Sequence, residues 1–368
     1  MKALILSSNT GGGHNSCARA LQEALMARGI PCDIRDGLSF LSKEAPRFIS
    51  QWHVRFYRNM PRLYGEGYSL AEKHAHNMDD ESLVYRLLGF GAKSLRACIV
   101  SQGYTIVVCT HLFPGMMLTQ LQRRNPLPIV TGFISTDYTA SPGYEAIDLD
   151  WCFVPAPEIV GDFIKANMPA ERVVSCGMPV CPEYLTPADR DAAKRALGID
   201  PSHRHLLVMS GSMGCGPIKR IVRQFARTAD EAVEISVLCG TNRKLARQLS
   251  QKFADCANIH IHDFVERVSL FMDSADLYLT KPGGLGVSEA MAKRLPMVLL
   301  QAVNGCETHN LRYCLKKGVA VTAEDPDDIP PLCLRLIHDD AALDAMRLPP
   351  AEKSAADAVC DCLLNNEG

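Results

Sequence analysis

Short apolar runs alternate with segments of helical periodicity along almost the whole chain, and this pattern limits the possible folds more than any other feature. Such an alternation is typical of parallel β-sheets that are covered by helices. We predict strands near residues 2–8, 31–36, 104–109, 127–134 and 150–154, and again near 204–210, 233–239, 257–262, 275–280, 296–301 and 319–322. The sequence therefore predicts an α/β fold with two Rossmann-like parallel-sheet domains.

A proline-rich stretch at 177–205 interrupts the alternation and predicts a linker between the two domains. We expect domains at 1–180 and 181–345, with a mostly helical insertion at about 42–101 in the first, followed by a C-terminal segment at 346–368. In that last segment Ala355, Val359 and Cys362 fall on one helical face. Ligands of parallel sheets bind beyond the carboxyl ends of strands, so a site in a central cleft faced by the two domains is expected.

Charge and cysteine content exclude several classes of protein. The net charge of −2 argues against a nucleic-acid binder, which is usually basic. The N-terminal apolar run is too short for a signal peptide, and no window approaches the roughly 18 apolar residues that span a bilayer. The 15 cysteines include no C-x-x-C pair, and several, such as Cys109, Cys152 and Cys239, lie in apolar runs. We therefore expect a cytoplasmic protein with reduced thiols, no metal site and at most peripheral membrane contact.

The first strand runs into Asn-Thr-Gly-Gly-Gly-His at residues 9–14, and a helix follows. Glycines let the backbone approach a ligand, and the helix offers free N–H groups to an anion. A dinucleotide site is one alternative, because the spacing nearly matches its fingerprint and Asp36 ends the second strand. The missing third glycine and the histidine disfavour it.

Two further glycine-rich turns occur in the second half of the chain. Gly-Ser-Met-Gly-Cys-Gly-Pro at 211–217 follows a strand, and Thr-Lys-Pro-Gly-Gly at 280–284 follows another. The helix after the second turn carries Glu289 in its first turns. A carboxylate there can accept hydrogen bonds from both hydroxyls of a ribose, while the glycines leave room for a diphosphate. Alternatively, Glu289 only stabilises the helix N-terminus.

These blocks, with Cys-Thr-His-Leu-Phe-Pro at 109–114, Ser-Thr-Asp-Tyr at 135–138, Asp-Phe-Val at 263–265 and Gly-Cys-Glu at 305–307, resemble the diacylglycerol glycosyltransferases. That group includes monogalactosyldiacylglycerol synthases and processive glucosyltransferases, relatives of the peptidoglycan N-acetylglucosaminyltransferase. The resemblance implies a GT-B fold with an acceptor domain, a UDP-sugar domain and a C-terminal helix that crosses back to the first domain. It also implies metal-independent chemistry without a cofactor, because the UDP-sugar is a substrate.

The resemblance assigns roles to individual residues. Phe264 and the Val265 backbone would border the uracil, Glu289 would hold the ribose, and Glu307 and Asn310 would face the sugar and phosphates. The full donor set is Gly211, Ser212, Gly214, Phe264, Val265, Gly283, Gly284, Ser288, Glu289, Glu307 and Asn310. The acceptor or membrane set is Gly12, Gly13, Trp52, Phe56 and His111. Cys306 stands where the family often has glutamine, which leaves the identity of the sugar open.

Transfer to an alcohol needs a base for the hydroxyl proton. His14, at the end of the first strand, is the first candidate because imidazole titrates in the right range. Asp137 could orient His14 or act as the base itself, and His111 is a third candidate. Inversion at the anomeric carbon is implied by the resemblance alone.

Within 43–76 the charges sum to +3, and Phe48, Trp52, Phe56 and Met60 recur every four residues. A basic helix with an aromatic stripe suits an anionic membrane surface, although an ordinary core helix is the alternative. We therefore predict a hexosyltransferase, peripheral on the inner face of the cell membrane, that moves a hexose from a UDP-sugar to diacylglycerol or a related glycolipid. The alternatives are a polyprenyl-linked acceptor and a non-catalytic nucleotide-sugar-binding protein.

Overall fold

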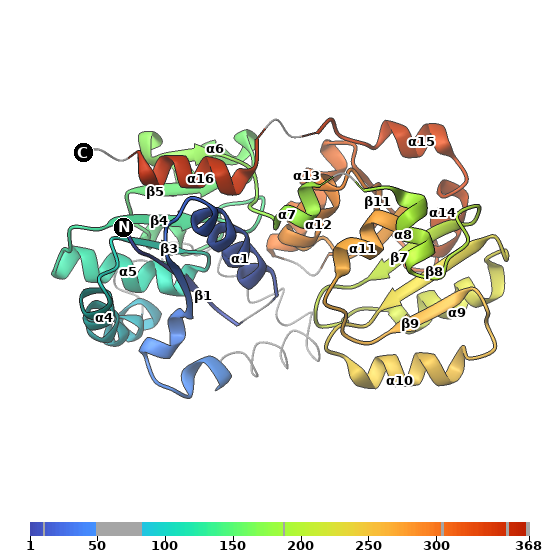
Figure 1. Cartoon of the computed structure of the whole chain (residues 1–368), viewed down its shortest axis with the longest axis horizontal. Coiled ribbons are helices and arrows are strands. Elements are labelled where there is room, and N and C mark those ends of the chain that lie inside the picture. The colour runs from blue at the N-terminus through green and yellow to red at the C-terminus, as the bar shows by residue number, and fades with distance from the viewer. Residues whose placement is uncertain (10–11, 49–82, 187, 303–304, 351–352, 366–368) are drawn as a thin grey trace. The chain divides into compact units, whose positions relative to one another are not determined.

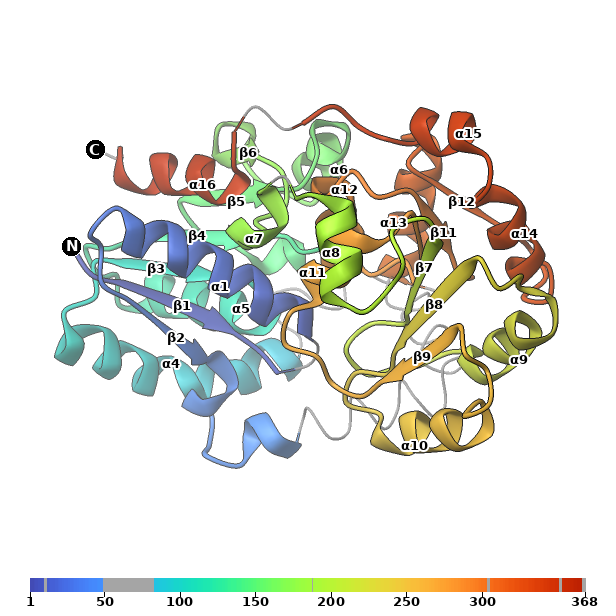
Figure 2. The same cartoon turned by 45° about the vertical axis from the view of Figure 1, so that its right-hand side comes forward.

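A computed structural model gives the fold of the chain and describes residues 1–9, 12–48, 83–186, 188–302, 305–350 and 353–365. The chain divides into two compact units (Figures 1 and 2). Unit 1 comprises Met1–Cys181, Asn304–His309 and Glu352–Gly368, and unit 2 comprises Pro182–Val303 and Asn310–Ala351. Each unit contains one six-stranded sheet in which every described strand pair is parallel. The predicted α/β class with two parallel sheets is confirmed.

The sheet of unit 1 has the strand order β2-β1-β3-β4-β5-β6. Its strands are β1 (Ala3–Ser7), β2 (Cys32–Asp36), β3 (Ile106–Cys109), β4 (Val130–Ile134), β5 (Trp151–Val154) and β6 (Val173–Ser175). Its helices are α1 (Gly12–Ala27), α4 (Leu83–Gln102), α5 (Leu112–Arg124), α6 (Val160–Lys165) and α16 (Ala355–Leu364), with short 3-10 turns η1 (Gly37–Phe40), η3 (Tyr144–Ala146), η4 (Pro157–Ile159) and η5 (Ala170–Arg172). Every residue of β1 is buried, which explains its uninterrupted apolar run.

The sheet of unit 2 has the order β12-β11-β10-β7-β8-β9. Its strands are β7 (Arg204–Met209), β8 (Val233–Leu238), β9 (Ile259–His262), β10 (Leu277–Thr280), β11 (Met297–Leu299) and β12 (Ala320–Thr322). Its helices are α7 (Pro182–Leu185), α8 (Arg190–Ala196), α9 (Ile218–Thr228), α10 (Arg243–Lys252), α11 (Val268–Ser274), α12 (Gly284–Ala292), α14 (Ile329–Leu336) and α15 (Asp340–Ala345). The first turn of α13 (Cys306–Lys316) is counted with unit 1 and the rest with unit 2.

The structure differs from the predicted elements in two places. Strand β6 was not predicted, because its three residues lie at the sheet edge and are only partly buried, so they make no apolar run. The stretch predicted as a linker contains α7 and α8, and α8 begins where the Asp189 carboxylate accepts hydrogen bonds from the N–H groups of Asp191 and Ala192. Of the predicted insertion at 42–101, residues 49–82 lie outside the described part of the chain.

Helix α16 packs on α1, and the two run side by side in Figures 1 and 2. Arg28, just after α1, forms ion pairs with Asp357 at 3.1 Å and Asp361 at 2.9 Å. The predicted apolar face is displaced by one residue. Val359 is buried as expected, but its buried companions are Ala356, Cys360 and Leu363 rather than Ala355 and Cys362.

Cys109, Cys152 and Cys239, which lie in apolar runs of the sequence, are buried, and no disulfide links the 15 cysteines, all of which lie in the described ranges. Among the helices described, none combines the length and the hydropathy needed to cross a membrane.

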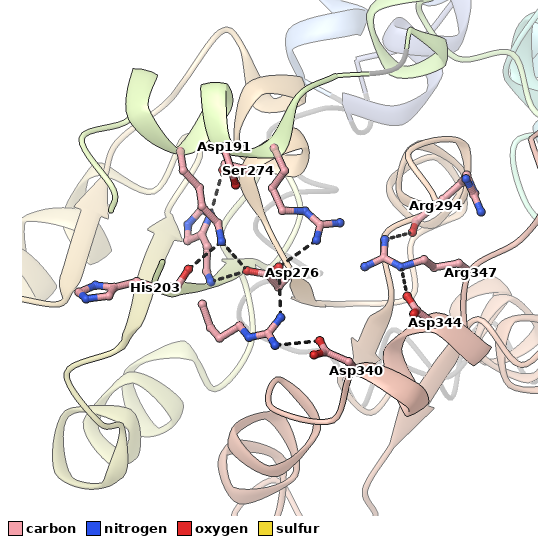
Figure 3. Close-up of polar contacts among 12 residues, drawn as sticks. Asp191, His203, Ser274, Asp276, Arg294, Asp340, Asp344 and Arg347 are labelled. Atoms are coloured by element: carbon pink, nitrogen blue, oxygen red, sulfur yellow. Dashed lines mark hydrogen bonds and ion pairs between the residues drawn. The ribbon is translucent and has the colours of Figure 1, made fainter. Parts of the chain in front are cut away.

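A buried carboxylate ties the amino-terminal ends of β7 and β10 to α8 (Figure 3). Asp276 accepts hydrogen bonds from Arg190 Nη1 at 3.0 Å, Lys194 Nζ at 3.0 Å and the His205 N–H at 2.9 Å. Ligands of parallel sheets bind at the opposite, carboxyl ends of the strands. We therefore interpret this cluster as part of what holds unit 2 together.

Candidate active site

In unit 1, three neighbouring strands end at the same edge of the sheet. Because β1, β3 and β4 are parallel and adjacent, the segments that follow them lie near one another. The predicted Gly12, Gly13 and His14 form the first turn of α1 after β1, while Thr110 follows β3 and Thr136 follows β4.

His14 is held at its Nδ1 atom by two oxygen atoms. Nδ1 lies 2.7 Å from the carbonyl oxygen of Thr110 and 3.1 Å from Oγ1 of Thr136, and Oγ1 of Thr110 donates to the His14 carbonyl at 3.1 Å. A carbonyl oxygen can only accept, so Nδ1 must carry a proton. In the neutral ring, Nε2 is then the atom that can accept one.

His111 lies beside His14 in an edge-to-face arrangement. The ring centroids are 4.6 Å apart and the ring planes form an angle of 76°. It is the N-cap of α5, where its Nδ1 accepts a hydrogen bond from the Phe113 N–H at 3.2 Å. The neutral His111 ring therefore carries its proton on Nε2. Capping a helix is a sufficient structural reason for a histidine at this position.

Asp137 is half-buried and follows Thr136 directly. Its carbonyl oxygen accepts a hydrogen bond from Ser135 Oγ at 3.1 Å. Burial, and in addition the charge of Asp137, raise the pKa of the Tyr144 hydroxyl well above its usual range. At Nδ1 of His14 the orienting groups are Thr110 and Thr136, whose roles were not predicted from the sequence.

Asp36 was considered above as a ligand for the ribose of a dinucleotide. In the structure its carboxylate instead accepts hydrogen bonds from nearby backbone N–H groups. Its two oxygens accept from the Asn9 N–H at 3.2 Å and the Leu38 N–H at 2.9 Å. Asn9 Oδ1 in turn accepts from Asn15 Nδ2 at 2.6 Å, and Asn15 Oδ1 accepts from Ser7 Oγ at 2.6 Å. This network joins Ser7 and Asn9, at the end of β1, to Asn15 in α1.

In unit 2, the glycine-rich turn after β7 is fastened to the turn after β8. Gly214 has a φ of 55°, and a Cβ there would overlap the carbonyl oxygen of Cys239, so only glycine fits. The Ser212 carbonyl accepts from the Thr241 N–H at 2.8 Å, and the Gly214 carbonyl accepts from Asn242 Nδ2 at 3.0 Å. The predicted residues of this loop therefore belong to a rigid turn.

Lys281 lies between the two glycine-rich turns of unit 2. Its Cε atom is 2.7 Å from the position that a Cβ on Gly211 would take and 3.8 Å from that of a Cβ on Gly283. β7 and β10 are neighbours in the sheet, which is why the turns after them are close. The sequence predicts the Lys-Pro-Gly-Gly turn but does not mark this lysine as a site residue. In the sequence, Lys281 stands between the end of a strand and two glycines, and this pattern could have marked it as a site residue.

Glu289 and Ser288 lie in α12 and are 7% and 6% exposed. The Ser288 hydroxyl donates to the Gly284 carbonyl at 2.7 Å, so its proton takes part in a hydrogen bond within α12. Burial, with the charge of Glu289 contributing, raises the pKa of Tyr278 in β10 well above its usual range. Asn310 is fully buried and donates through Nδ2 to the Pro282 carbonyl at 3.1 Å, which fixes the Pro-Gly-Gly turn.

The remaining predicted residues are distributed as follows. Phe264 follows the edge strand β9 and is 63% exposed, and Val265 beside it is partly buried. Glu307 lies in the first turn of α13 and is buried. Trp52 and Phe56 lie outside the described residues.

The chain contains two Asp-x-Asp triplets, at 148–150 and 325–327, and each has structural partners. Asp148 pairs with Arg123 at 3.4 Å and Arg172 at 2.9 Å, and Asp150 accepts from the Thr131 hydroxyl at 2.7 Å. In the second triplet, Asp327 pairs with Arg220.

Comparison with known proteins gives matches along most of the chain. Residues 14–180 match the family model of monogalactosyldiacylglycerol (MGDG) synthase, and residues 205–325 match that of the glycosyltransferase family 28 C-terminal domain. A processive diacylglycerol beta-glucosyltransferase of Bacillus cereus (strain AH187) is 25% identical over 376 residues, covering 99% of this chain and 93% of that protein. The predicted family resemblance is thereby confirmed.

Solved structures of similar fold include UDP-GlcNAc 2-epimerase from Neisseria meningitidis, with a TM-score of 0.66, 12% identity and complete coverage of both chains. Acinetobacter baumannii MurG has a TM-score of 0.58 and 16% identity, with 99% of each chain covered. At such identities the likeness concerns the fold alone, and that fold is of the predicted GT-B class.

Proposed function

Because the chain belongs to the glycosyltransferase family of the MGDG synthases, with a family 28 C-terminal domain, we propose that it moves a hexose from a UDP-sugar to the hydroxyl of diacylglycerol or a closely related glycolipid. The Bacillus cereus relative is a processive diacylglycerol beta-glucosyltransferase, which supports both the class of sugar and the lipid acceptor.

The observation that carries the donor half of this proposal is the position of Lys281. Its side chain lies between two glycine-rich turns at the carboxyl ends of neighbouring strands, where a diphosphate can approach the backbone. Helix α12 begins at the second of these turns, so its N-terminal N–H groups add positive potential. A lysine and a helix N-terminus suit the charge that develops on UDP as it leaves.

Further donor contacts follow from the positions of the predicted residues. The buried carboxylate of Glu289 is proposed to accept hydrogen bonds from the ribose hydroxyls, and the exposed ring of Phe264 to pack against the uracil. Asn310 is proposed to act through the Pro-Gly-Gly turn that it holds. Glu307, in the loop-proximal turn of α13, is proposed to face the sugar.

The proposed chemistry is a single displacement with inversion. The acceptor oxygen bonds to the anomeric carbon, the bond from that carbon to the UDP oxygen breaks, and UDP leaves with the electron pair. The hydroxyl proton passes to Nε2 of His14, whose Nδ1 already carries a proton that it donates to the Thr110 carbonyl. Asp137 remains the alternative base.

We also propose that unit 1 meets an anionic membrane surface, where a lipid acceptor resides. Helix α4 supports this, because Leu87 is 50% and Phe90 is 77% exposed. Arg86 and Lys93 are exposed on the same side of the helix, four residues before and three residues after Phe90. Exposed apolar side chains flanked by cations suit a surface of anionic headgroups.

Incubation with each labelled UDP-hexose and diacylglycerol vesicles, followed by mass analysis of lipid products, tests the proposal. We expect a lipid that is heavier by one or more hexoses, with UDP released in equal amount. A product formed only on polyprenyl phosphate carriers would replace the acceptor, and tight UDP binding without turnover on any acceptor would favour a non-catalytic binding protein. Conversion of a UDP-sugar without an acceptor would refute transfer altogether.

A further inference from the structure

We infer that Thr136 is a positioning residue for His14: with the Thr110 carbonyl it forms a two-acceptor clamp on Nδ1 that makes Nε2 the proton-accepting atom and stabilises the ring once it is positive. This inference rests on the proposed function, in which His14 accepts the hydroxyl proton. It assigns a role to a side chain that the sequence patterns did not single out.

The first step concerns the Thr110 carbonyl, which decides the tautomer. Its oxygen lies 2.7 Å from Nδ1, a distance that requires a proton between the two atoms because the oxygen cannot donate. Thr110 also binds the backbone of His14, since its hydroxyl donates a hydrogen bond to the His14 carbonyl at 3.1 Å. One residue thus fixes both the main chain and the ring of His14.

The second step concerns the Thr136 hydroxyl, which lies 3.1 Å from the same nitrogen. With the proton already on Nδ1, this oxygen is a second acceptor of that N–H. Thr136 is only 6% exposed, so little water is available to replace its hydroxyl. An acceptor at Nδ1 strengthens its bond when the ring becomes an imidazolium, because a charged donor makes the stronger hydrogen bond.

The third step is that both clamp atoms are neutral. A histidine base is often backed by a carboxylate, which stabilises the imidazolium by a full charge. Here the atoms at Nδ1 are a carbonyl and a hydroxyl. Among the described residues, titratable groups near His14 include His111, at 4.6 Å between ring centroids, and Asp137, next to Thr136 in the chain. Both must be considered in any pH experiment.

The tautomer is measured directly by ¹⁵N NMR of the full chain labelled at histidine, with the His14 signals identified by their loss in His14→Gln. We expect a protonated Nδ1 and an unprotonated Nε2 at high pH. A His14 ring protonated on Nε2 instead would overturn the inference, whatever the activity of the protein.

Thr136→Val removes the hydroxyl at nearly constant volume. We expect kcat to fall about 10- to 100-fold, the scale of one hydrogen bond to a charged group, with the KM for the UDP-sugar unchanged. The His14 titration, followed by NMR, and the acid limb of the pH–rate profile should both move to lower pH. Thr136→Ser should restore the rate, and Thr136→Asp should move the profile to higher pH.

Thr139→Val is the matched control, because Thr139 is also a buried threonine of this loop at 6% exposure. It should leave rate and titration unchanged. If Thr136→Val shifts neither the titration nor kcat while the wild type transfers sugar, the inference fails and the proposed function stands. If the tautomer and the shift are found as expected but no acceptor is glycosylated, the clamp stands and the proposed function fails.

Discussion

Replacing Asp276 by asparagine tests whether the buried ion cluster of unit 2 holds the unit together. The side chains of Asp276 and Lys194 are 2% and 4% exposed, and their charged atoms lie 3.0 Å apart (Figure 3). In Asp276→Asn, Lys194 retains its hydrogen bond to the His203 carbonyl at 2.7 Å but loses the negative charge of the Asp276 carboxylate. Its ammonium is then buried without compensation.

The expected magnitude follows from this burial. Removing one member of a buried ion pair typically costs about 3–5 kcal/mol, because the remaining charge is desolvated. The pair of Asp276 with Arg190 adds little, since the arginine side chain is 38% exposed and water screens it. We therefore expect the free energy of unfolding of unit 2 to fall by about 3–5 kcal/mol, a large part of the stability of an ordinary domain.

Hydrogen exchange of unit 2 peptides at increasing urea measures this loss without assuming that the whole chain unfolds in one step. The matched control is Asp340→Asn, which removes a carboxylate 2.8 Å from Arg204 that is 72% exposed and should cost about 1 kcal/mol or less. Lys194→Met combined with Asp276→Asn should recover part of the loss, because both charges are then gone. Equal effects of Asp276→Asn and Asp340→Asn would refute the reasoning.

Three further predictions concern charge, pH and lipid. Lys281→Met should weaken UDP binding by about 1.5–3 kcal/mol in calorimetry but leave uridine binding nearly unchanged, and an equal loss for both ligands would remove Lys281 from the diphosphate site. Burial lowers the pKa of His205 to about 4, while its ring nitrogens lie 2.9 Å from the hydroxyls of Ser236 and Ser274. A depressed histidine pKa means that the unfolded chain binds the proton first, so this contribution is complete above about pH 6.5 and is lost, by about 3 kcal/mol, as pH falls to 4. His205→Gln should flatten that part of the stability–pH curve, and an unchanged slope would contradict the assignment. Phe90→Ser should reduce binding to anionic vesicles about 10- to 100-fold, because one aromatic side chain would no longer be buried in the membrane. The control is Ile164→Ser on α6, where the side chain is 42% exposed and binding should not change. Equal effects of the two substitutions would argue against α4 as the membrane contact.

The sheets could be predicted from sequence because their strands are buried on both faces. In β1 the run Ala-Leu-Ile-Leu-Ser has no exposed residue, so hydrophobicity alone marks it. The same signal fails for β6, where Val173 and Val174 are half-buried and Ser175 is exposed. Helix α8 was missed because prolines nearby indicated a linker, although Pro182 in fact begins α7.

The candidate site was predictable only as far as residue types carry chemistry. Glycine turns and His14 stand out at strand ends, where ligands of parallel sheets bind. The contribution of Thr110 comes from a backbone carbonyl, which every residue has, and that of Thr136 depends on the register of β3 and β4. For Asp36 the sequence left a ribose ligand of a dinucleotide as an alternative that the missing glycine disfavoured, and in the structure its carboxylate accepts hydrogen bonds from Asn9 and Leu38.

The packing of α16 on α1 has a consequence for how the chain is made. Strands β1 to β6 have all been synthesised when Cys181 leaves the ribosome, but α16 follows only after about 170 further residues, most of them in unit 2. At about 5–20 residues per second this interval lasts on the order of ten to thirty seconds. During it, the surfaces of α1 and β4 against which α16 later packs remain uncovered, and Leu363, whose Cδ2 lies 3.5 Å from the position that a Cβ on Gly132 would take, has not yet been made. The nascent first unit should therefore be a chaperone substrate throughout synthesis of the second, and its release from chaperones should depend on α16, which is translated after unit 2.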